Sequence, residues 1–397
     1  MEIRSVTLFS DPELPAPSVS GFLVAARTQF PVRVQSLRLG TRPFPNWLPR
    51  ESAVTAAMEF VAAWQTAGID YVSLGPVGLD DDVSWLDLIP DLIGTTGTTF
   101  ASVTIAGEDG RLSLERCRAM ARCIRQVSTI YPDGFGNLFM GGLAAVGPGH
   151  PFLPATYHSG GPAHFAIAVE SGDLALSAVH AATTLDEARA NLIAAIESAA
   201  AEIAPVAEAL SREFGVAFSG LDFSLAPYPT PEQSLAGAME ALGVPHLGAP
   251  GGLFAAAFIT EAIDRAQFPR TGFSGLMLPV LEDAVLARRA AEGHISLNDL
   301  LVYSAVCGVG LDTIPLPGDI SEAALTGILL DVAALASRLR KPLVARLMPL
   351  PGLSAGDPTA FDFEYFAPSR VLDVPGGGVD GLLLGQSFLD LQRYRSR

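Results

Sequence analysis

The sequence predicts an α/β fold, and three observations carry this prediction. Strand-like and helix-like segments alternate along most of the chain. The composition, 49% hydrophobic and 17% charged, is that of a protein with a large packed core. The length of 397 residues exceeds the usual single core, but closed α/β barrels reach this size as one domain. We therefore expect a single domain over residues 1–397, with the Gly/Pro-rich loop 131–161 as a possible internal joint.

The alternation begins at the N-terminus. Residues 3–9 and 32–39 read as strands, because polar and apolar side chains alternate and β-forming types dominate. Residues 50–67 place Val54, Met58, Val61 and Trp64 at helical spacing before Gly68. Further elements follow in the order strand 69–74, strand 100–105, helix 112–127, strand 165–170, helix 185–214, strand 216–227, helix 323–339 and strand 342–348.

The overall charge excludes several classes of partner. A net charge of −17 argues against sequence-independent nucleic-acid binding and against anchoring on anionic lipid, since both need clustered cations. The N-terminus lacks a signal-peptide pattern, and no uninterrupted apolar run predicts a membrane span. We expect a cytoplasmic protein. The mean hydropathy of +0.35 is high for a soluble chain and suggests a homodimer.

The stretch 303–319 holds the densest set of reactive groups. It combines Cys307 with Asp312 and Asp319 between an apolar helix-like segment and a proline-rich turn. Cys307 is a candidate nucleophile or acid/base thiol, or else a small buried hydrophobe. Asp312 and Asp319 are candidates for proton transfer, substrate binding or metal ligation, or else cap turns.

Other candidates stand at strand ends and in loops. Asp222 and Ser224 lie near the end of a predicted strand, where α/β proteins build sites. The loop with Gly248, Gly251 and Gly252 opens an apolar helix and could hold an anion on its N–H groups, or be a plain close-packed turn. Among the histidines, His158 is the preferred site residue.

Three charged residues complete the set. Arg346 lies inside an apolar strand and could bind the same anion as the glycine loop. Asp283 could bind a divalent metal, although its position also suits the first turn of a helix. Asp362, among aromatic residues, is a second possible metal ligand.

Seven segments spread over the chain also carry a family resemblance: 46–48, 71–76, 152–158, 221–227, 274–283, 303–319 and 346–352. The last three are the most specific, and include Ser274-Gly-Leu-Met-Leu-Pro-Val-Leu-Glu-Asp283 and Arg346-Leu-Met-Pro-Leu-Pro-Gly352. Together they resemble the uncharacterised, pyruvate formate-lyase-like family called domain of unknown function 711, or uncharacterised protein family 0210.

The resemblance implies a more specific fold. It implies a closed ten-stranded α/β barrel of the glycyl-radical-enzyme type, with an inner hairpin loop and surrounding helices. By the same resemblance, residues 303–319 would be the inner loop and Cys307 its reactive residue. The C-terminal glycines, in Val374-Pro-Gly-Gly-Gly-Val-Asp-Gly381, do not match the glycyl radical motif, so no stored radical is expected.

The preferred functional hypothesis is an enzyme of unknown reaction, acting on a small anionic or carboxylated metabolite in the barrel centre. Cys307, Asp312, Asp222 and His158 would be catalytic, while the glycine loop, Arg346, Ser224 and Asp319 would bind substrate. Two alternatives remain open: a divalent-metal enzyme built on the acids, and a ligand-binding barrel without chemistry.

Overall fold

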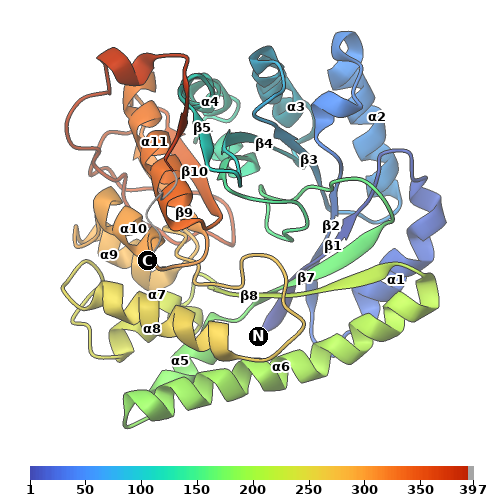
Figure 1. Ribbon diagram of the computed structural model, residues 1–397. Coiled ribbons are helices and arrows are strands. Elements are labelled where there is room, and N and C mark those ends of the chain that lie inside the picture. The colour runs from blue at the N-terminus through green and yellow to red at the C-terminus, as the bar shows by residue number, and fades with distance from the viewer. Residues whose placement is uncertain (392–397) are drawn as a thin grey trace.

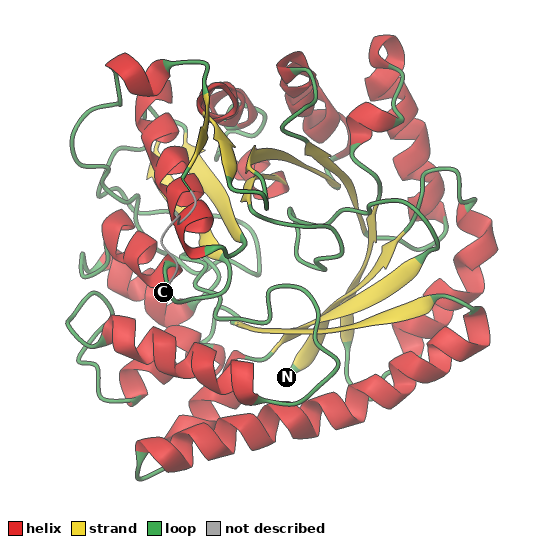
Figure 2. Ribbon diagram, in the orientation of Figure 1, coloured by secondary structure: helices red, strands yellow, loops and turns green. Residues whose placement is uncertain are grey.

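The computed structural model describes residues 1–391, so residues 392–397 of the predicted domain lie outside the described residues. One large curved sheet runs through the molecule, with helices on its convex side (Figure 1, Figure 2). The eleven strands are β1 (Glu2–Phe9), β2 (Val34–Gly40), β3 (Tyr71–Val77), β4 (Thr99–Ala106), β5 (Arg111–Ser113), β6 (Met140–Ala144), β7 (His164–Glu170), β8 (Ala217–Ala226), β9 (Gly310–Pro317), β10 (Leu343–Leu350) and β11 (Phe388–Asp390). The α/β class is confirmed.

The α-helices follow and interleave with the strands, as the alternating pattern predicts. They are α1 (Ser20–Thr28), α2 (Ala53–Thr66), α3 (Ile89–Thr96), α4 (Leu114–Val127), α5 (Gly172–His180), α6 (Leu185–Phe214), α7 (Leu235–Ala241), α8 (Gly252–Arg265), α9 (Ala284–Ala291), α10 (Leu297–Ser304) and α11 (Glu322–Leu339). Because the helices cover one face and loops the other, most strands are buried on both sides and read as nearly continuous apolar runs.

Strand order and direction divide the sheet into blocks. The order is β8-β7-β1-β2-β3-β4-β6-β10-β9, with β5 and β11 attached beyond β4. Along this path only the β1–β7 and β6–β10 contacts are antiparallel. Five strands, β1, β2, β3, β4 and β6, therefore run one way, and β7 to β10 run the other way. The ends where β1 to β4 begin thus lie beside the ends where β7 to β10 finish.

The main path of strands ends at β8 and β9, and within residues 1–391 no continuous ladder joins these two strands. The irregular segment 269–283 lies between them instead. It forms one isolated bridge to each edge, Leu221 with Arg270 and Pro279 with Asp312. The closed ten-stranded barrel of the glycyl-radical type is therefore not confirmed, because hydrogen bonds do not close the sheet.

The loop between β6 and β7 occupies the concave side of the sheet (Figure 1). Ser73 of β3 donates a hydrogen bond to the Thr156 carbonyl at 2.5 Å. Gly141 of β6 packs so closely against Pro154 that a Cβ there would lie 2.4 Å from the proline ring. The predicted inner loop, 303–319, forms instead the end of α10, a turn and edge strand β9, so an inner hairpin there is not confirmed.

The loop range 131–161, considered above as an internal joint, contains β6, which lies in the sheet between β4 and β10. Among residues 1–391, the long helix α6 alone has the length and composition of a membrane span. It packs along α1, α5, α8 and β8 and buries a stripe that includes Leu192, Ile196 and Ile203. This is the arrangement of a helix that covers a protein core.

Candidate functional site

A cavity of about 360 Å³ lies at the end of the sheet where β1, β2, β3 and β4 begin. This end is opposite to the one where parallel α/β sheets usually build sites. The residues that line it are Arg4, Gln35, Ser36, Arg38, Tyr71, Gly97, Thr98, Phe100, Phe135, Leu138, Phe139, Phe152, Leu153, Glu282, Arg346, Asp362, Phe363 and Tyr365. Its size is typical of small-molecule sites.

A buried ion-pair network forms one part of the cavity. Glu282 accepts a hydrogen bond from Arg4 Nη2 at 2.5 Å and one from Arg346 Nη2 at 3.2 Å. Arg346 Nε also donates to Asp312 Oδ1 at 2.5 Å. Two guanidinium groups are thus balanced by two carboxyl groups, and side chains from β1, β9, β10 and segment 269–283 are held together.

The backbone is irregular where the network forms. The pairing of β1 with β7 shifts by one residue at Arg4. Where β10 pairs with β9, Arg346 stands opposite the two residues Asp312 and Thr313, and Thr313 has a positive φ of 43°. Bulges of this kind re-aim side chains and are common beside functional sites. They direct both arginines and Asp312 to one place.

Arg38 is the exception to this balance of charge. Its Nε donates to Ser36 Oγ at 2.9 Å, but in residues 1–391 no carboxylate oxygen lies within 4.0 Å of its guanidinium group. Burial lowers the pKa of Arg38 to about 9, and the positive charge of Arg4 acts in the same direction. Arg38 is partly buried, and a partly buried cation without a counterion loses part of its hydration, a cost that an anion in the cavity would offset.

Two buried carboxyl groups next to this cluster hold protons more strongly than usual. Burial raises the pKa of Glu170, at the end of β7, to about 7. Burial also raises the pKa of Asp312, against the opposing attraction of Arg346. Asp312 Oδ2 is buried and has no hydrogen-bond partner within the described chain. Carboxyl groups in this state are candidates for proton transfer.

Of the residues predicted from the sequence, three meet here. Arg346 and Asp362 line the cavity, and Asp312 accepts a hydrogen bond from Arg346 without lining the cavity itself. Asp362 is exposed and lies at the rim. Arg346 thus lies beside a cavity, and its role in binding an anion stays a prediction.

Asp222 and Ser224 lie elsewhere and are engaged with each other. Ser224 donates to Asp222 Oδ1 at 2.5 Å, and Asp222 also accepts from the backbone N–H groups of Phe273 and Ser274. These bonds attach segment 269–283 to β8. Burial raises the pKa of Asp222 despite them.

Asp283 caps two helices at once. Its carboxylate accepts from Val285 and Leu286 at the start of α9, and from Leu235 and Ala236 at the start of α7. Ser234 Oγ donates a fifth hydrogen bond at 2.5 Å. The contacts of Asp283 are therefore those of a helix cap, and both of its carboxylate oxygen atoms accept hydrogen bonds.

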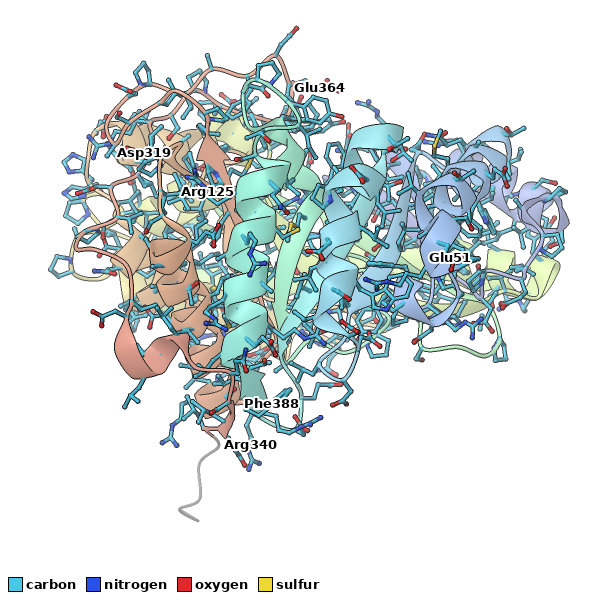
Figure 3. All side chains as sticks on the ribbon, turned by 90° about the horizontal axis from the view of Figure 1, so that it is seen from above. Glu51, Arg125, Asp319, Arg340, Glu364 and Phe388 are labelled. Carbon is cyan, nitrogen blue, oxygen red and sulfur yellow. The ribbon has the colours of Figure 1, made fainter. Side chains whose placement is uncertain are left out.

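Asp319 is exposed in the turn after β9, at the outside of the molecule (Figure 3). Arg125 donates to the two carbonyls that flank it, those of Gly318 and Ile320. Asp319 does not line the cavity.

The glycine loop is a tightly packed turn before α8. Gly248 N–H donates to Tyr303 Oη at 2.9 Å, and a Cβ on Gly248 would lie 1.8 Å from the His294 carbonyl oxygen. Gly251 has a φ of 103° and precedes α8, while Gly252 packs against Tyr303. None of these glycines lines the cavity.

Cys307 and His158 are both buried outside the cavity lining. Cys307 lies in the turn between α10 and β9, where Lys341 Nζ donates to its carbonyl oxygen. His158 lies in the loop between β6 and β7, with Nε2 3.3 Å from the Gly161 carbonyl oxygen and 3.9 Å from an Asp11 carboxylate oxygen. Their catalytic roles stay predictions.

Metal ligation gains no support from the arrangement of side chains. Across residues 1–391, no three His, Cys, Asp or Glu side chains are grouped so that they could hold a metal ion. Asp283 and Asp362, the two predicted ligands, lie in different surroundings, one capping helices and the other at the cavity rim.

The sequence interpretation missed Arg4 and Arg38, although both carry the signal that revealed Arg346. Each is an arginine inside a strand, although Glu2 and Gln35 make these two strands less uniformly apolar than the strand of Arg346. Glu282, which precedes Asp283, was not among the predicted site residues either. Glu170 ends a predicted strand and was not singled out.

Comparison with known proteins places these features in a family. The family model described as Uncharacterised ACR (DUF711) matches residues 20–364. A UPF0210 protein of Pyrobaculum arsenaticum is 32% identical over 344 residues, which cover 82% of this chain and 75% of the relative. A UPF0210 protein of Pyrobaculum aerophilum is 42% identical over 218 residues, 52% of this chain and 48% of the relative.

A UPF0210 protein of Methanopyrus kandleri is 31% identical over 323 residues, covering 78% of this chain and 71% of the relative. None of these descriptions refers to pyruvate formate-lyase. The family part of the resemblance is thus shown, and the link to that enzyme is not.

Proposed function

The chain belongs to the UPF0210 (DUF711) family, and from that premise we propose that it binds a small anionic metabolite in the cavity at the start of β1 to β4. The observation that carries the proposal is the state of Arg38. Its guanidinium group lines the cavity, donates one hydrogen bond to Ser36 and pairs with no carboxylate among the described residues. A bound anion would supply the missing partner.

The surrounding charges support the same proposal. Arg4 and Arg346 line the cavity beside Arg38 and are fixed by Glu282 and Asp312, so they need no rearrangement to meet a ligand. A preorganised site of this kind binds more tightly than a flexible one, because less conformational freedom is lost on binding.

The experiment measures binding of acetate and inorganic phosphate by calorimetry to the wild-type protein and to Arg38→Gln. A hydrogen bond to a charged group contributes about 1.5–3 kcal/mol, so we expect the variant to bind roughly 10- to 100-fold more weakly. Arg33→Gln is the matched control, since the Arg33 side chain is 67% exposed and Arg33 lies two residues before the lining residue Gln35 without lining the cavity itself. Equal binding by all three proteins would refute the proposal.

A second function, acid–base catalysis on the bound anion, is supported by Asp312. Its unpartnered Oδ2 is fully buried and its neighbour Arg346 faces the cavity. Turnover would then depend on Asp312 and on pH. An Asp312→Asn variant that binds acetate normally but turns over an identified substrate at the wild-type rate would exclude this role.

The thiol prediction is kept as a separate proposal: Cys307 would act as nucleophile or acid/base group if the turn before β9 opens. Alkylation of Cys307 by iodoacetamide that slows when acetate is added would support it. A thiol that stays inert under native conditions would remove it.

The composition supports two further proposals, a cytoplasmic location and assembly as a homodimer. Native mass measurement at low protein concentration that finds only monomer would exclude the dimer.

A further inference from the structure

The charge of the cavity limits the charge of its ligand. Arg4 pairs with Glu282, and Arg346 pairs with both Glu282 and Asp312, so these four groups balance when both carboxyl groups are ionised. Only the guanidinium group of Arg38 is left over. Asp362, at the rim, is exposed to solvent, so water screens its negative charge from the interior of the cavity. One surplus cation fits one negative charge, and a polyphosphate would bring several more charges than the lining neutralises.

The rest of the lining is strongly aromatic. Seven of the eighteen lining residues are Phe or Tyr, against 8% of the chain, so aromatic side chains are concentrated at this cavity. Six of them contact one another in a continuous series from β3 to the rim: Tyr71, Phe100, Phe139, Phe135, Phe363 and Tyr365. We call these six residues the aromatic belt.

Ring distances within the aromatic belt suit further aromatic contact. Neighbouring centroids are 4.9 to 5.8 Å apart, and the rings are tilted or edge-on to each other. Rings packed in this way present edges and faces to the cavity, which are the surfaces that pair with another ring. An aliphatic ligand would fill the same volume without that contact.

The cationic and aromatic parts of the lining are directly adjacent. Arg38 of β2 is the ladder partner of Tyr71 in β3. Arg346 places its Cζ 5.4 Å from the ring centroid of Phe152. When the anionic group of a ligand contacts the arginines, the neighbouring atoms of that ligand therefore lie against aromatic rings. One small molecule can thus contact both parts of the lining.

From these observations we propose that the ligand is a small aromatic monocarboxylate, with its carboxylate on Arg38 and its ring against the aromatic belt. This inference rests on the proposed function, because it assumes that an anion binds in the cavity. It adds the chemical class of that anion, and its test separates the two.

The test compares three carboxylates by calorimetry on the full chain: acetate, cyclohexylacetate and phenylacetate. The last two share size and charge and differ in the aromaticity of the ring. Aromatic pairs contribute beyond area burial, so we expect phenylacetate to bind roughly 2- to 10-fold more tightly than cyclohexylacetate. Acetate should be the weakest, since it lacks the buried ring.

Two variants locate the effect. Phe363→Leu removes a ring of the aromatic belt and should reduce the preference for phenylacetate over cyclohexylacetate. Phe361→Leu is the matched control, because Phe361 packs against Phe135 and Phe366 as Phe363 does but does not line the cavity. Should either variant fail to fold, the comparison of ligands on the wild-type protein still decides.

The outcomes are distinct. Equal affinity for phenylacetate and cyclohexylacetate, or tighter binding of inorganic phosphate than of phenylacetate, would overturn the aromatic class. Anion binding would still stand in either case if Arg38→Gln weakened it. Failure of every anion to bind would overturn both proposals.

Discussion

Glu282 and Asp283 are neighbours in sequence and both are buried, yet their surroundings differ completely. Glu282 is bound by two arginines and faces a cavity. Asp283 is bound by four backbone N–H groups and a hydroxyl, and faces the starts of two helices. The Glu282 carboxylate orients two arginine side chains beside the cavity. The Asp283 carboxylate caps the N-termini of α7 and α9. The donor type thus separates a site residue from a structural one.

The largest expected effect comes from Asp283→Ala. It leaves buried N–H groups at the starts of α7 and α9 without acceptors, so we expect the free energy of unfolding to fall by about 3–5 kcal/mol. Urea unfolding measures this loss. Asp319→Ala is the control, since Asp319 is exposed and should change stability by less than about 0.5 kcal/mol. A loss below about 1 kcal/mol for Asp283→Ala would contradict the structural role.

A smaller effect is expected for Glu282→Gln. Arg4 and Arg346 lose a counterion while the amide keeps part of the hydrogen bonding, so we expect a stability loss of about 2–3 kcal/mol. Added acetate should recover more of the melting temperature in this variant than in wild type, because an anion can replace the lost charge. Thermal unfolding with and without acetate checks this.

Glu364→Gln is the control for Glu282→Gln, since Glu364 is exposed and lies between the lining residues Phe363 and Tyr365 in the chain. It should respond to acetate as the wild type does. If acetate raised the melting temperature of Glu282→Gln no more than that of wild type, the proposal that Glu282 belongs to an anion-binding cavity would be contradicted.

The smallest effect, about 1–3 kcal/mol, concerns Glu170 and depends on pH. The pKa of Glu170 in the folded protein is about 7, above the unfolded value of about 4.3. Between these pH values the folded protein retains a proton that the unfolded chain has released, so this group lowers stability as pH rises through the window. Glu170→Gln should therefore be more stable than wild type at pH 8 and equal to it at pH 4, by thermal unfolding.

An identical pH dependence in wild type and Glu170→Gln would show that Glu170 does not belong with the perturbed carboxyl groups around Arg4. Glu2→Gln serves as the comparison, because Glu2 is the strand partner of Glu170 but is more exposed.

The sequence revealed the strand and helix alternation and one member of the site, Arg346, because a charge inside an apolar strand is visible in any sequence. Arg4 carried the same signal but stood in a strand interpreted only by its alternation. The aromatic belt could not be predicted, since its members come from β3, β4, the segment before β6 and the segment after β10. Only the order of strands in the sheet brings them together.

The roles of the acids were predictable only as alternatives. Asp222 and Asp283 fit both ligation and backbone bonding, and the choice depends on which N–H groups segment 269–283 and α7 bring near them. Those contacts are long-range in sequence. Strand closure could not be decided either, because the link between β8 and β9 is two isolated bridges with no regular pattern of residues.

A sheet with free edges at β8 and β9 would present two rows of backbone groups on which another chain could add a strand and aggregate. Residues 269–283 lie against both edges. The segment contains Pro269 and Pro279, which have no N–H group to donate, so it is a poor template for a further strand. The piece of chain that carries Glu282 to the cavity therefore also protects the folded protein from edge-to-edge association with its own copies.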